Sequence, residues 1–170
     1  MTTGDIVEEL DDEADFSAFV LARQQRLVRF AYLLTGDPHQ AEDIVQSALL
    51  KVYRRWDHIT GSPDAYVRAA IVNEHHSWWR RPVRRREVTN SDLVTFTDPA
   101  VTSEPAADHD LRAQIAALPR QQRAALVLRY YEDLTEAQTA EILGCSVGTV
   151  KSHTSRALKN LRVTMREATA

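Results

Sequence analysis

The stretch of sequence that decides the fold is residues 135–161, TEAQTAEILGCSVGTVKSHTSRALKNL. Thr135 and Gln138 have the spacing of a helix capping box, and Gly144 suits the left-handed position that ends a helix. Ser146 then supplies a cap for a second, longer helix. A short helix, a glycine turn and a longer helix in this order predict a helix-turn-helix.

The second helix of this motif has two faces of opposite character. Its apolar residues recur at helical spacing from Val147 to Leu161 and predict a buried side. The opposite side and its flanks carry small, hydroxyl and basic side chains, which can approach base edges and donate to bases or phosphates. We predict DNA contacts at Thr149, Lys151, Ser152, His153, Ser155, Arg156 and Lys159. The alternative is an ordinary helical hairpin with a solvated outer face.

Charge is segregated along the chain, although the net charge of the 170 residues is only −3. Residues 1–15 contain seven acidic residues and residues 87–107 contain four, with no Lys or Arg in either segment. Residues 16–86 carry a net charge of +6 and residues 108–170 one of +2. Basic blocks separated by acidic ones are typical of a protein that binds nucleic acid with two separate parts.

These blocks, together with the helix signals, define the expected domain organisation. We expect an unstructured acidic leader over residues 1–15, a helical domain over 16–86, an extended acidic linker over 87–107, a second helical domain over 108–166 and a short tail over 167–170. The predicted fold class is all-α, with two small helical domains joined by the linker. Because no stretch approaches the roughly 20 apolar residues that span a membrane, we expect a cytoplasmic protein with no membrane partner.

The first domain is predicted to contain three helices, the last of which ends in a basic, aromatic segment. Asp37 and Pro38 can start the second helix, and Pro63 can start the third. The third runs into Trp78-Trp79-Arg80-Arg81 and is followed by Arg84-Arg85-Arg86. Indole faces can stack on unpaired bases, at about 1–3 kcal/mol per base, while arginines neutralise phosphates. The alternative is a pair of core tryptophans with a charged rim.

Several motifs together resemble those of the extracytoplasmic-function sigma factors of the sigma-70 superfamily, in particular the actinobacterial-type SigE-like group with Trp-Trp-Arg-Arg. Residues 35–49 (TGDPHQAEDIVQSAL) resemble the region 2 motif, residues 65–81 the segment that reads and melts the −10 element, and residues 118–131 with 147–153 region 4. The resemblance covers residues 16–166. It implies a sigma region 2 helical bundle and a sigma region 4 helix-turn-helix.

The resemblance also implies a function and a set of partners. The protein is expected to be a non-enzymatic factor, without cofactor or small-molecule substrate, that directs core RNA polymerase to −10 and −35 elements and assists promoter melting. Its expected partners are the clamp helices of the largest polymerase subunit, the beta flap, and promoter DNA in duplex and single-stranded form. Whether an anti-sigma factor binds it is left open.

The site residues are carried over by position in the matching motifs. Core-polymerase contacts are expected at Asp43, Gln46, Arg54 and Arg55. Contacts to −10 DNA are expected at Asn73, Trp78, Trp79, Arg80, Arg81, Arg84 and Arg85, with Asn73 lining a pocket for a flipped base. Lys151, Ser152, Ser155 and Arg156 match the −35 contact positions of region 4.

Two other functions are alternatives to this one. Residues 148–153 also resemble the recognition helix of response-regulator-type transcription factors, which bind duplex DNA as dimers, but the sequence supplies no α/β receiver with an acidic pocket. An enzyme is the other alternative, with Glu74-His75-His76 as its one tempting cluster. Adjacent residues on a helix diverge by about 100°, so we expect no metal site there.

Overall fold

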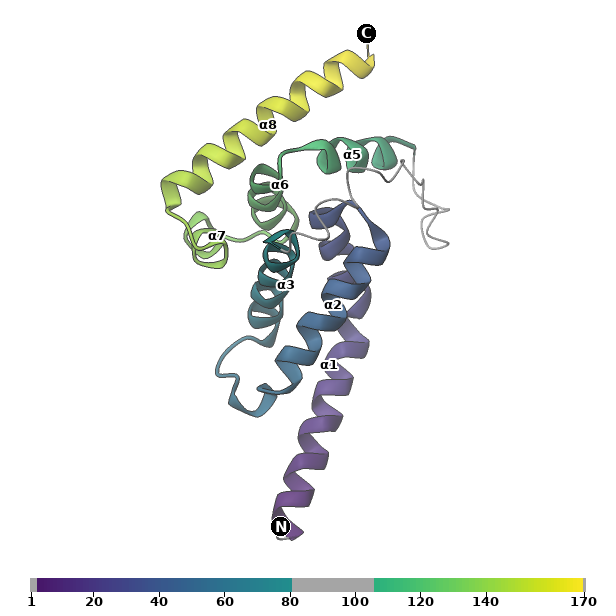
Figure 1. Ribbon diagram of the computed structural model, residues 1–170, viewed down its shortest axis with the longest axis vertical. Coiled ribbons are helices and arrows are strands. Elements are labelled where there is room, and N and C mark those ends of the chain that lie inside the picture. Colours follow the sequence, from purple (N-terminus) through teal and green to yellow (C-terminus); the bar gives the residue numbers. More distant parts are fainter. Residues whose placement is uncertain (1–2, 81–105, 170) are drawn as a thin grey trace.

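The computed structural model describes residues 3–80 and 106–169, with side chains described over residues 14–78 and 110–166. These two ranges contain helices and no strand, which confirms the prediction of an all-α fold (Figure 1). In chain order the elements are α1 (Thr3–Thr35), α2 (Pro38–Tyr53), the 3-10 helix η1 (Trp56–His58), α3 (Pro63–Arg80), α5 (Ala106–Ala117), α6 (Arg120–Leu126), the π-helical turn η2 (Val127–Tyr131), α7 (Glu136–Leu143) and α8 (Val147–Thr169).

The first domain consists of α1, α2 and α3, which pack on one another around an apolar core. The start of α2 is fixed as predicted, because Asp37 Oδ1 accepts a hydrogen bond from the Gln40 backbone N–H at 2.8 Å and Pro38 occupies the first turn. Phe30 of α1 and Ile71 of α3 are fully buried. Each such side chain stabilises the fold by about 1.5–3 kcal/mol relative to an exposed one.

The acidic leader differs from its prediction. α1 begins at Thr3, so residues 3–15 are helical rather than unstructured as their composition predicts. The segment contains no Pro, and it continues directly into the amphipathic helix that covers the core. Propagating an existing helix costs far less than starting a new one, and acidic residues near a helix amino terminus interact favourably with its dipole.

The second domain consists of α5 to α8, and its local signals are confirmed. Thr135 and Gln138 form a reciprocal capping box, with backbone-to-side-chain hydrogen bonds of 3.2 and 2.9 Å. Gly144 ends α7 in the left-handed conformation, with φ of 63°. Ser146 Oγ then accepts a hydrogen bond from the Thr149 backbone N–H at 3.1 Å at the start of α8. The predicted helix-turn-helix is therefore present.

The two domains are packed directly against each other. Figure 1 shows α6 at the carboxyl end of α3, with α5 across the end of α1 and α2. Buried Leu27 and Phe30 of the first domain belong to one apolar cluster with Val127, Leu128 and Leu134 of the second. Because this cluster is shared, the two domains have a common core. The predicted linker falls almost wholly on residues 81–105, which lie outside the described ranges.

The turn between α1 and α2 is a point of close approach between the domains. Gly36 has a φ of 74°, and a Cβ atom added to it would lie 3.2 Å from the Cβ of Ala116 in α5. A side chain at this position would therefore meet both backbone strain and a neighbouring helix. Glycine permits the second domain to sit directly on the turn.

Candidate nucleic-acid interface

α8 presents the predicted duplex-reading residues on the side away from its core contacts. Fully buried Val150 and Ala157 fix the rotation of the helix against α6 and α7. On the remaining surface Lys151, Ser155, Arg156 and Lys159 are exposed, and Thr149, Ser152 and His153 are half-buried. Val147 differs from its predicted place in the buried stripe and is 40% exposed, since it is the first residue of α8.

Two of these residues already have partners within the domain. Thr149 Oγ1 lies 2.9 Å from Ser146 Oγ, so its hydroxyl belongs to the cap of α8. Lys151 Nζ lies 3.5 Å from a carboxylate oxygen of Glu136 in α7. An exposed pair of this kind is worth at most about 1 kcal/mol, so the ammonium group can exchange Glu136 for a phosphate.

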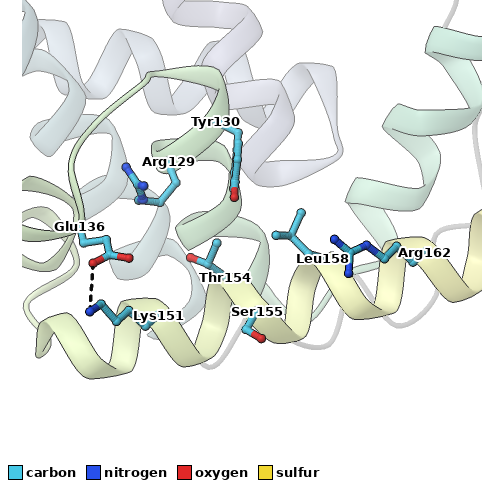
Figure 2. A pocket seen from close by; sticks show the side chains of 8 residues that line it. All are labelled: Arg129, Tyr130, Glu136, Lys151, Thr154, Ser155, Leu158 and Arg162. Atoms are coloured by element: carbon cyan, nitrogen blue, oxygen red, sulfur yellow. Dashed lines mark ion pairs between the residues drawn. The ribbon is translucent and has the colours of Figure 1, made fainter.

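An open pocket of about 300 Å³ lies between η2 and α8 (Figure 2). It adds Arg129 and Arg162, which were not predicted, to the basic surface of the domain. The Arg129 guanidinium also donates to the backbone carbonyl oxygen of Leu134. The sequence could have predicted that Arg162 lies on this surface. Helical steps of three and four residues connect Lys151, Ser155, Leu158 and Arg162 along one side of the helix. The residues lining the pocket are Arg129, Tyr130, Glu136, Lys151, Thr154, Ser155, Leu158 and Arg162.

The predicted −10 surface is only partly described. Asn73 is exposed on α3, and Trp78 is half-buried near the end of the same helix. Next to Asn73, Glu74 forms an ion pair with Lys51 of α2, which ties α3 to the second helix. The other five predicted contacts cannot be placed with these two. The side chains of Trp79 and Arg80, and all of Arg81, Arg84 and Arg85, lie outside the described residues.

His75, on the opposite side of α3 from solvent, is 1% exposed. Burial, followed by the neighbouring charges of His76, Arg123 and Arg120, lowers the pKa of His75 to about 3. The imidazole is therefore neutral at physiological pH and lies close to two arginines of α6. Within the described residues, no group of three His, Cys, Asp or Glu side chains could hold a metal ion.

The predicted polymerase-binding residues form an exposed strip on α2 and the turn after it. Asp43 and Gln46 lie on the outer face of α2, and Arg54 and Arg55 follow its last turn; all four are exposed. Leu50, which was not predicted, stands between them and is 55% exposed. The strip therefore has an apolar side chain at its centre and polar side chains at both ends, as the hot spots of many protein interfaces do.

The structure thus defines a class of protein, namely a helical two-domain protein with a helix-turn-helix whose outer face is basic. Family models identify it further: residues 8–86 match Sigma-70 region 2, and residues 108–161 match Sigma-70, region 4. The chain belongs to the sigma-70 family, as a member of its extracytoplasmic-function branch. This confirms the resemblance seen in the sequence and does not favour the response-regulator alternative. None of the helices that the structure describes is long and apolar enough to cross a membrane.

Known relatives cover most of the chain. The RNA polymerase sigma-E factor of Streptomyces avermitilis is 38% identical over 151 residues, which span 87% of this chain and 83% of the relative. The ECF RNA polymerase sigma factor SigL of Mycobacterium tuberculosis is 34% identical over 160 residues, or 83% of each chain. Among solved structures, the sigma factor RpoE of Bartonella quintana, in complex with the anti-sigma factor NepR, aligns with a TM-score of 0.72 and 30% identity over 89% of this chain and 97% of that one.

Proposed function

We propose that this sigma factor binds core RNA polymerase through its first domain and uses α3 and α8 to read the −10 and −35 elements of its promoters. The observation that carries the proposal is the presence of two separate exposed surfaces, the polar strip of α2 with Leu50 at its centre and the basic face of α8, in one sigma-70 chain. The protein acts in the cytoplasm and contributes no catalytic group, since RNA synthesis belongs to the polymerase.

The −35 element is read from the major groove by α8. Arg156 and Lys159 are exposed and long enough to reach guanine O6 and N7, and small Ser152 and Ser155 let the helix approach the base edges. Arg129 lies beside this surface and is suited to the phosphate backbone, where it would fix the register of the helix.

The −10 element is held at the far end of α3. Asn73 is exposed and can hydrogen-bond the edge of an unstacked base. The sequence continues from Trp78 into a basic segment, which suits stacking of further bases and neutralisation of the strand. Melting would then be assisted because bases captured here are withdrawn from the duplex.

Core polymerase is bound by the strip on α2. Leu50 is the anchor, because an exposed leucine gains free energy when a partner removes it from water. Asp43, Gln46, Arg54 and Arg55 surround it and supply orientation through hydrogen bonds and charge. An anti-sigma factor is a further candidate partner, since the solved relative RpoE was crystallised with one.

The test is run-off transcription with purified bacterial core polymerase and genomic DNA, using two variants that separate the surfaces. Arg156→Ala is expected to lower transcription from −35-dependent promoters by roughly 5- to 150-fold, the equivalent of about 1–3 kcal/mol for one base contact, while core binding is unchanged. Asp43→Arg is expected to weaken core binding while −35 duplex binding is retained. Loss of core binding in Arg156→Ala, or no specific transcript from the unaltered protein, would contradict the proposal.

A further inference from the structure

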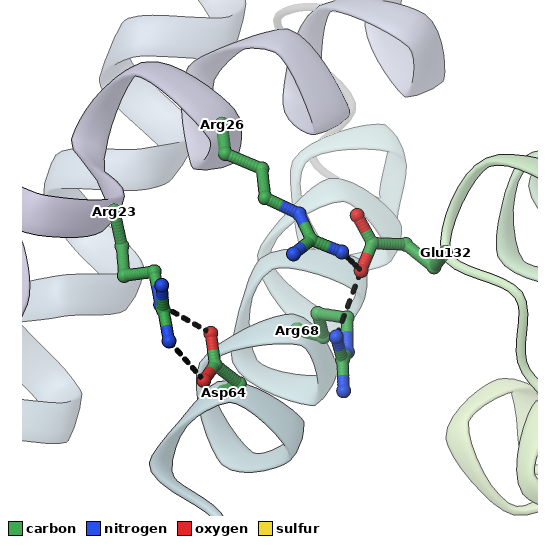
Figure 3. Close-up of polar contacts among 5 residues, drawn as sticks. All are labelled: Arg23, Arg26, Asp64, Arg68 and Glu132. Carbon is green, nitrogen blue, oxygen red and sulfur yellow. Dashed lines mark hydrogen bonds and ion pairs between the residues drawn. The ribbon is translucent and has the colours of Figure 1, made fainter.

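Glu132, at the end of η2, is a buried carboxylate whose partners belong to the other domain. Its side chain is 2% exposed and accepts a hydrogen bond from Arg68 of α3 at 2.8 Å and from Arg26 of α1 at 3.2 Å (Figure 3). Removing one partner from a buried ion pair leaves an uncompensated charge. Glu132 therefore depends on the packing of the second domain against the first.

The apolar contacts beside this ion triad make the docked arrangement specific. Val127 and Leu128, five and four residues before Glu132, are buried in the cluster that includes Leu27 and Phe30 of α1. The interface thus combines an apolar patch, which holds the domains together, with one carboxylate that pairs with two arginines only in the docked arrangement.

This arrangement cannot engage both promoter elements. Positions −10 and −35 are 25 base pairs apart by their designation, which is about 85 Å along B-form DNA. In the structure, α3 and α7 have Cα atoms within 8 Å of one another, and α8 packs on α7. The two reading helices are therefore separated by no more than a few helix diameters of about 10 Å each.

We propose that the described arrangement is a closed resting conformation, that Glu132 is its latch, and that the latch must release before the chain can hold both promoter elements. This inference rests on the proposed function for the need to open, but the latch itself is a property of the free chain. Release transfers Glu132 to water and leaves Arg26 and Arg68 with their charges unpaired. Phosphate oxygens of bound DNA can then replace the carboxylate as their partners.

The chain provides a matched control for this latch. Arg23 of α1 donates to Asp64 of α3 at 3.1 and 3.4 Å, so this pair joins the same two helices but lies entirely within the first domain (Figure 3). Breaking it removes a carboxylate–arginine contact without touching the domain interface. A change in domain separation caused by Glu132 substitutions should therefore be absent in Asp64→Asn.

The test measures the separation of the domains in the full-length free chain by single-molecule fluorescence energy transfer. Dyes are attached at Ala22→Cys in α1 and Val163→Cys in α8, both exposed positions, after Cys145→Ser removes the native thiol. The unaltered interface should give one short distance. Glu132→Lys, which faces both arginines with a third cation, should raise the ratio of open to closed molecules by roughly a hundredfold or more.

Two further variants keep the outcome decisive. Glu132→Lys combined with Arg26→Glu and Arg68→Glu rebuilds the triad with reversed charges, and it should restore the short distance. Circular dichroism of each variant checks that helix content is retained, and the milder Glu132→Gln replaces Glu132→Lys if it is not. An unchanged distance in the Glu132 variant that retains its helix content, or an equal increase in Asp64→Asn, overturns the latch.

Adding core polymerase to the labelled chain tests the opening itself. The inter-dye distance should lengthen on binding, and it should lengthen at lower polymerase concentration in Glu132→Lys. If the distance stays short in a complex that transcribes, the closed conformation is not a resting state and the inference is wrong. If Glu132→Lys opens the free chain but neither protein transcribes, the latch stands and the proposed function fails.

Discussion

The neutral His75 makes the stability of the protein depend on pH in a way that one substitution can isolate. The pKa of His75 is about 3 in the folded chain, against about 6.5 for an unperturbed imidazole. Between these two values the unfolded chain binds one more proton than the folded one. The free energy of unfolding therefore falls as pH drops below 6.5, and it levels off below pH 3.

The magnitude follows from the two pKa values. Going from pH 7 to pH 5 protonates the unfolded imidazole almost completely and the folded one hardly at all, which costs about 2 kcal/mol of stability. The physical cause is that His75 is buried, with His76, Arg123 and Arg120 close enough to oppose a further positive charge. His75→Gln keeps a polar side chain of similar size but cannot take up the proton.

The assay is urea denaturation of the unaltered protein and His75→Gln at pH 7 and pH 5, followed by circular dichroism. Carboxylates and the other histidines titrate in both proteins, so the difference between the two pH dependences belongs to His75. The unaltered protein is expected to lose about 2 kcal/mol more than the variant between these pH values. Equal losses in both proteins would refute the assignment of a neutral, buried imidazole.

Two further predictions concern single positions. Leu50→Asp is expected to weaken core polymerase binding at least tenfold in a pull-down titration. The thermal midpoint of the protein should not fall, because the Leu50 side chain is 55% exposed. Ser47→Asp, at a neighbouring exposed position, is the control, and a loss of binding of the same size in it would contradict the anchor role of Leu50. Gly144→Ala is expected to lower the free energy of unfolding by about 1–2 kcal/mol, because φ is 63° while the space around an added Cβ is open. Gly144→Asn should cost less, since Asn tolerates this conformation, and an equal cost would point to steric crowding instead.

Local signals were sufficient to predict most of the helices and their caps, although not the start of α1. The caps at Asp37, Thr135 and Ser146 depend on residues within three positions of each other, so the sequence contains the whole interaction. The outward face of α8 was likewise predictable from periodicity. By contrast, the spacing did not reveal that the Thr149 hydroxyl contacts Ser146, because that contact depends on side-chain geometry. The sequence therefore predicted only the DNA-facing role of Thr149.

The features that the sequence did not reveal depend on contacts between distant residues. Glu132 gives no sign in the sequence that its partners are Arg26 and Arg68, 106 and 64 positions away. The sequence shows His75 only as part of a cluster whose spacing does not suit a metal; its burial against α6 follows only from the docking of the second domain. Leu50 is four positions from both Gln46 and Arg54, so helical spacing places it on the outer face of α2. A single exposed leucine is common on protein surfaces, however, and gives no sign of an interface in the sequence.

The shared core also bears on any attempt to study the two sigma regions apart. Val127, Leu128 and Leu134 are buried partly by α1, a helix of the other region, so a fragment cut at the family boundary of residue 108 would present them to water. Such a fragment would be prone to self-association. Its melting temperature would reflect the newly exposed apolar surface as well as the fold of the region itself. While the two regions stay docked in the intact chain, their unfolding is expected to be coupled.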